Sequence, residues 1–151
     1  MGAVYRALDE RLGHTVALKQ TLMTDPQLRA AFEQEARLLA RLHHAALPMV
    51  SDHFAEADGE FLVMPYIAGP DLAEQVQQRG APFPVADVLT WAERLLDALD
   101  DLHTQQPPVI HRDIKPQNLK LTSRGEPILL DFGLAKGAVG DPQSIVGYTP
   151  R

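Results

Sequence analysis

The sequence contains no cysteine, which excludes a disulfide framework and any thiolate metal site. It has no excess of basic residues either, and its formal net charge of -6 at pH 7 argues against a nucleic-acid partner, which would need a basic face. Its apolar runs, such as 61–64 and 127–130, are far too short to cross a membrane. No basic-then-apolar leader opens the chain. We therefore expect a cytoplasmic protein with no membrane segment in this chain.

With 151 residues, of which 45% are hydrophobic, the chain can build one domain with a real core. Residues that favour the extended state predict four strands in the first 66 residues and two short strands within 119–130, and helically spaced apolar residues predict three helices. The first helix should begin at Pro26 and end near 43–44. The order of strands, one helix, more strands and then mostly helix predicts an α+β fold whose antiparallel sheet comes first. The expected strands cover 2–10, 14–20, 49–54 and 60–66, and the later helices start near Asp71 and cover 85–103.

The most informative segment is the run HRDIKPQN at 111–118, which is followed by Asp131-Phe132-Gly133. This pattern sets an acid, a cation and two metal-binding groups around one phosphoryl-transfer centre. Such a reaction depends mainly on positioning and on neutralising charge on the phosphate oxygens. Asp, Asn and Pro are also common in ordinary turns. The combined spacing favours the catalytic interpretation over a turn.

With these motifs on the page, the chain resembles the eukaryotic-type Ser/Thr protein kinases, most closely those of bacteria. The run VALK at 16–19 is similar to the strand with the phosphate-binding lysine, and FEQEA at 32–36 to the next helix. The run GAVY at 2–5 looks like the end of the glycine-rich loop. The resemblance implies a partial kinase domain. Residues 1–66 would form an N-lobe lacking the start of that loop, and 67–151 the beginning of a C-lobe through part of the activation segment.

The resemblance also implies a set of catalytic roles, with ATP as phosphate donor and a protein Ser or Thr as acceptor. Lys19 would bind the α- and β-phosphates, and Glu35 would hold Lys19 by an ion pair. Asp113 would act as the base for the acceptor hydroxyl, and Lys115 would neutralise the γ-phosphate. For a lone Lys or Glu we would favour a solvated surface charge, but the motif positions favour the functional interpretation.

Magnesium and packing roles complete this implied site. Asn118 and Asp131 would be Mg²⁺ ligands, which suits a hard cation that prefers oxygen donors. His111 invites an acid–base role, but the resemblance favours packing in a hydrophobic column with Phe132. Arg112 marks a class of kinase that often responds to a phosphate on the activation loop.

The segment 61–72 resembles the hinge that holds adenine. Ile67 would donate its backbone N–H to the base. Asp71 would either accept from a ribose hydroxyl or cap a helix. Lys120 stands where the family usually has an apolar side chain, so its stem could pack under the base while its ammonium reaches solvent. The nucleotide-binding residues implied are Gly2, Val4, Ala17, Lys19, Met64, Ile67, Asp71 and Lys120.

Two other functions compete with an active protein kinase. One is a truncated kinase-like fragment with weak or no nucleotide binding and no turnover, because only the last glycine of the loop, Gly2, is present. The other is a small-molecule phosphotransferase of related fold, which usually lacks the full set of VALK, HRDIKPQN and DFG. The helix 85–103 has apolar residues around much of its circumference, which is typical of a buried helix.

Overall fold

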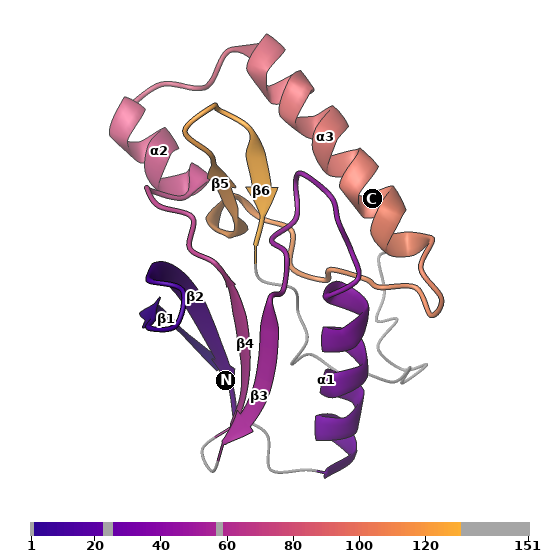
Figure 1. Cartoon of the computed structure of the whole chain (residues 1–151). Coiled ribbons are helices and arrows are strands. Elements are labelled where there is room, and N and C mark those ends of the chain that lie inside the picture. Colours follow the sequence, from indigo (N-terminus) through magenta and orange to yellow (C-terminus); the bar gives the residue numbers. More distant parts are fainter. Residues whose placement is uncertain (1, 23–25, 57–58, 131–151) are drawn as a thin grey trace.

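The computed structural model describes residues 2–22, 26–56 and 59–130. Four strands and one helix come first, and two helices and a small hairpin follow (Figure 1). This order confirms the predicted α+β class. The elements are β1 (Gly2–Asp9), β2 (His14–Thr21), α1 (Pro26–Leu39), β3 (Asp52–Glu56), β4 (Gly59–Pro65), α2 (Leu72–Arg79), α3 (Val85–His103), the 3-10 turn η1 (Pro116–Asn118), β5 (Leu119–Leu121) and β6 (Pro127–Leu129).

A four-stranded antiparallel sheet with the order β1-β2-β4-β3 forms one part of the molecule. Figure 1 shows α1 running alongside this sheet, with α2, α3 and the β5–β6 hairpin grouped at the other end. One hydrophobic core joins the two parts. Its buried members include Phe32 and Leu39 from α1, Leu62 and Met64 from β4, and Leu102 from α3.

The strand register decides which side chains share a face of the sheet. Val4 lies opposite Lys19, and Lys19 lies opposite Leu62 on its other side. Ala17 lies opposite Met64. Directly opposed residues point to the same face, and so do residues two apart on one strand. Val4, Ala17, Lys19 and Met64 therefore share the face on which Leu62 enters the core.

The first helix is shorter than the sequence predicts. It ends at Leu39 instead of near 43–44. The chain then tightens, because the N–H of Arg41 bonds to Leu38 O at 3.0 Å and that of Leu42 to Leu39 O at 3.1 Å. These are i→i+3 bonds, which typically close the end of a helix. The tightened turn carries Leu42 into the core, where it is buried.

The third strand is displaced from its predicted position at 49–54. It covers Asp52–Glu56, and Val50 instead turns inward and is buried in the core. The Ser51 N–H still bonds to Val63 O at 2.8 Å, so the chain joins the sheet edge just before the strand begins. Burial of one apolar side chain thus overrides an extended propensity.

The long helix α3 matches its predicted span. Ala98 and Leu102 are buried, and Leu95 and Leu99 pack against the core. The opposite side of α3 is not buried, although its apolar residues are typical of a buried helix. Val85, Val88, Leu89 and Leu96 are exposed there. Among the described residues, none of the helices is both long and apolar enough to span a membrane.

A buried carboxylate links the sheet to α1. Glu60 of β4 has a side chain only 2% exposed, and its Oε2 lies 3.1 Å from Nε2 of His53 on β3. Its Oε1 lies 3.8 Å from Nε of Arg29 on α1. The His53 ring also packs on Phe32 of α1, with ring centroids 5.7 Å apart. This cluster of Glu60, His53, Arg29 and Phe32 fixes how α1 sits on the sheet.

Gly59 opens β4 in a conformation that suits glycine, with φ at 148°. A Cβ there would lie 2.7 Å from the backbone oxygen of Thr21 on β2. We expect Gly59→Ala to lower the free energy of unfolding by roughly 1–3 kcal/mol, measured by urea denaturation. Gly13→Ala is the matched control, because Gly13 also has positive φ but nothing within 4 Å of its Cβ position. Equal losses in the two variants would show that the close approach to Thr21 is unimportant.

Candidate active site

The proposed base sits in a hydrogen-bonded loop between α3 and β5. Oδ2 of Asp113 accepts from Nζ of Lys115 at 2.8 Å and from Nδ2 of Asn118 at 3.0 Å. The same Nδ2 donates to the Asp113 backbone oxygen at 2.8 Å. Asn118 is buried, whereas the Asp113 side chain is 27% exposed. The structure therefore brings Asp113, Lys115 and Asn118 together, with the carboxylate held in place and open on one side.

His111 anchors this loop to the end of β6. It is 1% exposed, and its Nε2 lies 2.9 Å from Leu130 O while its Nδ1 lies 3.4 Å from the Asp113 N–H. With a carbonyl at one nitrogen and an amide at the other, Nε2 carries the proton and Nδ1 accepts. The buried position fits the packing role expected for His111. Its proposed neighbour Phe132 lies outside the described residues.

Leu130, the residue before Asp131, is held from both sides. Its N–H donates to Asn118 O at 2.7 Å, and its carbonyl accepts from His111. Asp131 itself lies outside the described residues, so its role as a metal ligand stays a prediction. The backbone that leads into it is nonetheless fixed against the loop that carries Asp113.

Arg112 adopts a left-handed backbone conformation, with φ at 65°. Non-glycine residues seldom do so, and such conformations cluster at functional sites. The two neighbours of this residue have opposite environments, since His111 is buried and Asp113 is partly exposed. The unusual turn separates the two, and the sequence alone gives no sign of it.

The proposed phosphate-binding Lys19 and Glu35, its proposed ion-pair partner, come from different elements. Lys19 is on β2, on the face shared with Val4 and Met64, and Glu35 is on α1. The Glu35 side chain lies outside what the structure describes, so the ion pair stays a prediction. Gly2 begins β1 and pairs with Thr21, at the end of the sheet where Lys19 lies.

The hinge segment connects β4 to α2. Met64 is buried at the end of β4, and Pro65 and Tyr66 are exposed. Asp71 caps α2: its Oδ1 accepts from the Glu74 N–H at 2.9 Å, and Glu74 reciprocates to the Asp71 N–H at 3.0 Å. The capping alternative for Asp71 is confirmed, and its contact with ribose stays a prediction.

Lys120 differs from the expectation that its ammonium reaches solvent. Nζ donates to Ile67 O at 3.0 Å and to Gly69 O at 2.7 Å, so the charge is attached to the hinge backbone. Two carbonyl dipoles within reach of the amine explain why it turns back.

Sequence reasoning missed the contacts of two cations with the ring of Tyr66. The guanidinium of Arg6 on β1 lies 5.2 Å from the centroid of the Tyr66 ring, and Nζ of Lys120 lies 5.9 Å from it. Contacts at these distances are attractive. The only signal in the sequence was the unusual lysine at 120, because its partners lie far away along the chain.

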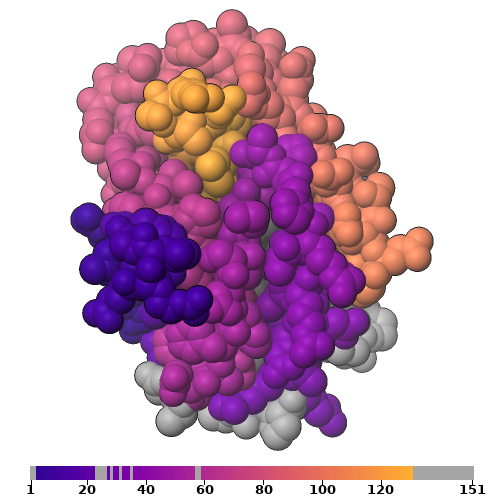
Figure 2. Space-filling model, viewed as in Figure 1, coloured from indigo at the N-terminus to yellow at the C-terminus, as the bar shows by residue number. Residues whose placement is uncertain are grey.

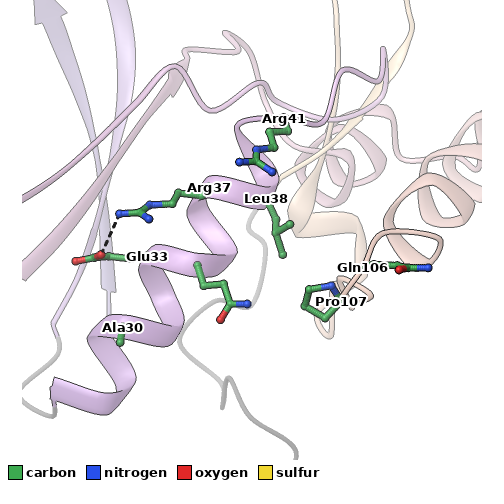
Figure 3. A pocket seen from close by; sticks show the side chains of 8 residues that line it. Ala30, Glu33, Arg37, Leu38, Arg41, Gln106 and Pro107 are labelled. Atoms are coloured by element: carbon green, nitrogen blue, oxygen red, sulfur yellow. Dashed lines mark ion pairs between the residues drawn. The ribbon is translucent and has the colours of Figure 1, made fainter.

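A separate hollow of about 300 Å³ lies outside this site, between α1 and the chain after α3. Figure 3 shows Leu38 of α1 pointing toward Pro107 across it, and Arg41, just after the helix, also lines it. Arg37 pairs with Glu33 at 3.6 Å, one turn earlier on the same helix. None of the predicted site residues lines this hollow.

The fold and the loop around Asp113 agree with comparisons to known proteins. The family described as "Protein kinase domain" matches residues 1–150. The chain therefore belongs to the protein kinase family.

Curated proteins similar to this chain include bacterial serine/threonine kinases. The chain is 39% identical over 145 residues to the probable serine/threonine-protein kinase pknA2 of Bifidobacterium longum. It is 38% identical over 136 residues to the serine/threonine-protein kinase PknL of Mycobacterium tuberculosis. These matches cover 91% and 88% of this chain, but the chain spans only 19% and 33% of the two relatives.

A solved structure gives the same result. The PknI kinase domain of M. tuberculosis aligns with a TM-score of 0.77 and 32% identity, over 90% of this chain and 55% of that one. The predicted kinase-like fold is confirmed.

Proposed function

We propose that this chain carries the nucleotide-binding and catalytic residues for transfer of the ATP γ-phosphate to Ser or Thr hydroxyls of protein substrates. The observation that carries the proposal is the hydrogen-bonded group of Asp113, Lys115 and Asn118, whose members meet as the motif predicts. The division into an N-lobe at 1–66 and the start of a C-lobe at 67–151 is part of the proposal. So are a cytoplasmic location and the absence of a nucleic-acid partner.

Asp113 is the group suited to take the proton of an incoming hydroxyl. One of its carboxylate oxygens is oriented by Lys115 and Asn118, and part of the side chain remains accessible. A base must be positioned before its proton affinity matters. Lys115, 2.8 Å from Asp113, also places a positive charge beside the position proposed for the transferred phosphate.

The residues also fit Mg²⁺ and ATP. Both Nδ2 contacts of Asn118 go to Asp113, and its amide oxygen Oδ1 is a donor of the kind that Mg²⁺ prefers. Asp131 would supply the second ligand, and the bound ion would offset phosphate charge. Val4 and Ala17 would cover the base, Met64 would close its inner end, and Ile67 would donate its N–H.

Lys19 provides the first test of the nucleotide site. We expect Lys19→Met to weaken Mg-ATP binding by roughly 10-fold to 100-fold, because a hydrogen bond to a charged group contributes about 1.5–3 kcal/mol. Asp131→Ala should weaken binding of Mg-ATP through loss of the metal. Both are measured by isothermal titration calorimetry.

Arg11→Met is the matched control, since it removes a cation at the exposed β1–β2 turn. Unchanged affinity in Lys19→Met and Asp131→Ala would contradict the proposed nucleotide site. Binding of Mg-ATP without any phosphate transfer would favour the alternative of a kinase-like fragment with no turnover.

A further inference from the structure

Lys120 joins β5 to the hinge by both its side chain and its main chain. Its Nζ donates to the backbone oxygens of Ile67 at 3.0 Å and Gly69 at 2.7 Å. Its main chain forms an antiparallel bridge with Asp71, the residue that caps α2. A charged donor shared by two carbonyls makes strong hydrogen bonds. The hinge is therefore held on β5 at three successive points.

The same ammonium also contacts the ring of Tyr66 in the hinge segment. Tyr66 has Arg6 of β1 at 5.2 Å from its ring centroid and Lys120 of β5 at 5.9 Å. The sheet and the hairpin are thus tied to one aromatic ring. This arrangement keeps the Lys120 head at the hinge and limits its freedom to swing into solvent.

The ammonium alters what the hinge offers to a base. If the backbone at Ile67, which follows the end of β4, is extended as in a strand, its N–H and C=O point to the same side. A purine that accepts from the Ile67 N–H therefore presents its neighbouring edge, position 2, toward the Ile67 oxygen. That oxygen already accepts from Lys120. The oxygen can accept a second hydrogen bond, but a 2-amino group that shares it would bring its hydrogens against the positively charged Nζ of Lys120.

We propose that Lys120 is a specificity-determining residue that clamps the hinge and selects purines without a 2-amino group, favouring adenine over guanine nucleotides. The selection rests on the proposed nucleotide-binding function, whereas the clamp does not. A site whose polar atoms cannot pair with a ligand group rejects that ligand strongly. Where the family usually has an apolar side chain, Lys120 thus places a charged group at the edge of the base.

The selection is tested with ATP and its 2-amino analogue, the triphosphate of 2,6-diaminopurine riboside, which differs from ATP only at position 2. Calorimetry with Mg²⁺ should show that the unmodified 151-residue chain binds ATP roughly tenfold more tightly than the analogue. Lys120→Met keeps the stem but removes the ammonium, so the two ligands should bind about equally. Lys120→Arg should retain the preference. The same preference in the unmodified chain and in Lys120→Met would overturn the selection.

The clamp is tested without nucleotide by the carbonyl carbon chemical shifts of Ile67 and Gly69. Both should move in Lys120→Met, while that of Gly80, at the far end of α2, should not. Unchanged shifts at Ile67 and Gly69 would overturn the clamp. If no variant binds either nucleotide, the proposed function fails and the purine selection fails with it, whereas the shifts still decide the clamp.

Discussion

Replacing Asp113 by alanine is expected to lower kcat for phosphate transfer to a protein Ser or Thr by roughly 10²–10⁴-fold, the usual contribution of a positioned base. The Kd for Mg-ATP should barely change, because Asp113 is proposed to contact the acceptor hydroxyl and not the nucleotide. The measurement is steady-state kinetics together with calorimetry. The assay uses a polypeptide that extends this chain to the length of the solved kinase domain it matches, of which it covers 55%.

Asp101→Ala is the control for loss of an acidic side chain, since Asp101 is exposed on α3, away from the loop that carries Asp113. It should leave kcat unchanged. A second variant, Lys115→Met, keeps the carboxylate but removes its 2.8 Å partner and the charge proposed to neutralise the γ-phosphate, so it tests Lys115 apart from the base itself. Full turnover in Asp113→Ala would contradict the assignment of the base.

Removing His53 is expected to lower the free energy of unfolding. Glu60 has a side chain 2% exposed, and His53→Leu would delete its 3.1 Å partner. Leaving a buried acceptor without its hydrogen-bond partner typically costs about 1–3 kcal/mol, and Glu60 would keep only the more distant Arg29, at 3.8 Å. Urea denaturation of the chain, followed by circular dichroism, measures the loss.

The control for this experiment is the double variant His53→Leu with Glu60→Leu. Replacing both partners by apolar groups removes the buried charge altogether, which is often close to neutral. Arg29 is 40% exposed and can turn to solvent when the carboxylate is gone. The double variant should therefore be more stable than His53→Leu alone. A double variant that is no more stable than His53→Leu would show that the histidine contributes through packing on Phe32.

The sequence predicted local elements better than distant pairings. The span of α3 and the N-cap of α2 follow from spacing and from the residue type at Asp71, which are local properties. The end of α1 and the start of β3 were misplaced, because burial of Leu42 and Val50 decides them.

The candidate site shows the same limit. Asp113, Lys115 and Asn118 are close in sequence, so a motif could predict that they meet. The attachment of Lys120 to Ile67 joins residues far apart in the chain, and only the fold brings them together. The sequence showed an unusual lysine but not what it would bind. The left-handed turn at Arg112 had no local signal, since glycine would be the usual choice there.

The two strands that carry Lys19 and Val4 are held differently in the sheet. β2, which carries Lys19, is bonded on both sides, whereas β1, which carries Val4, is an edge strand. In Figure 2 the indigo surface of β1 and β2 projects at one side of the molecule. Few buried contacts oppose local opening of such an edge. At the proposed nucleotide site, β1 would therefore open more readily than β2, so a nucleotide could exchange while Lys19 stays in place to align its phosphates.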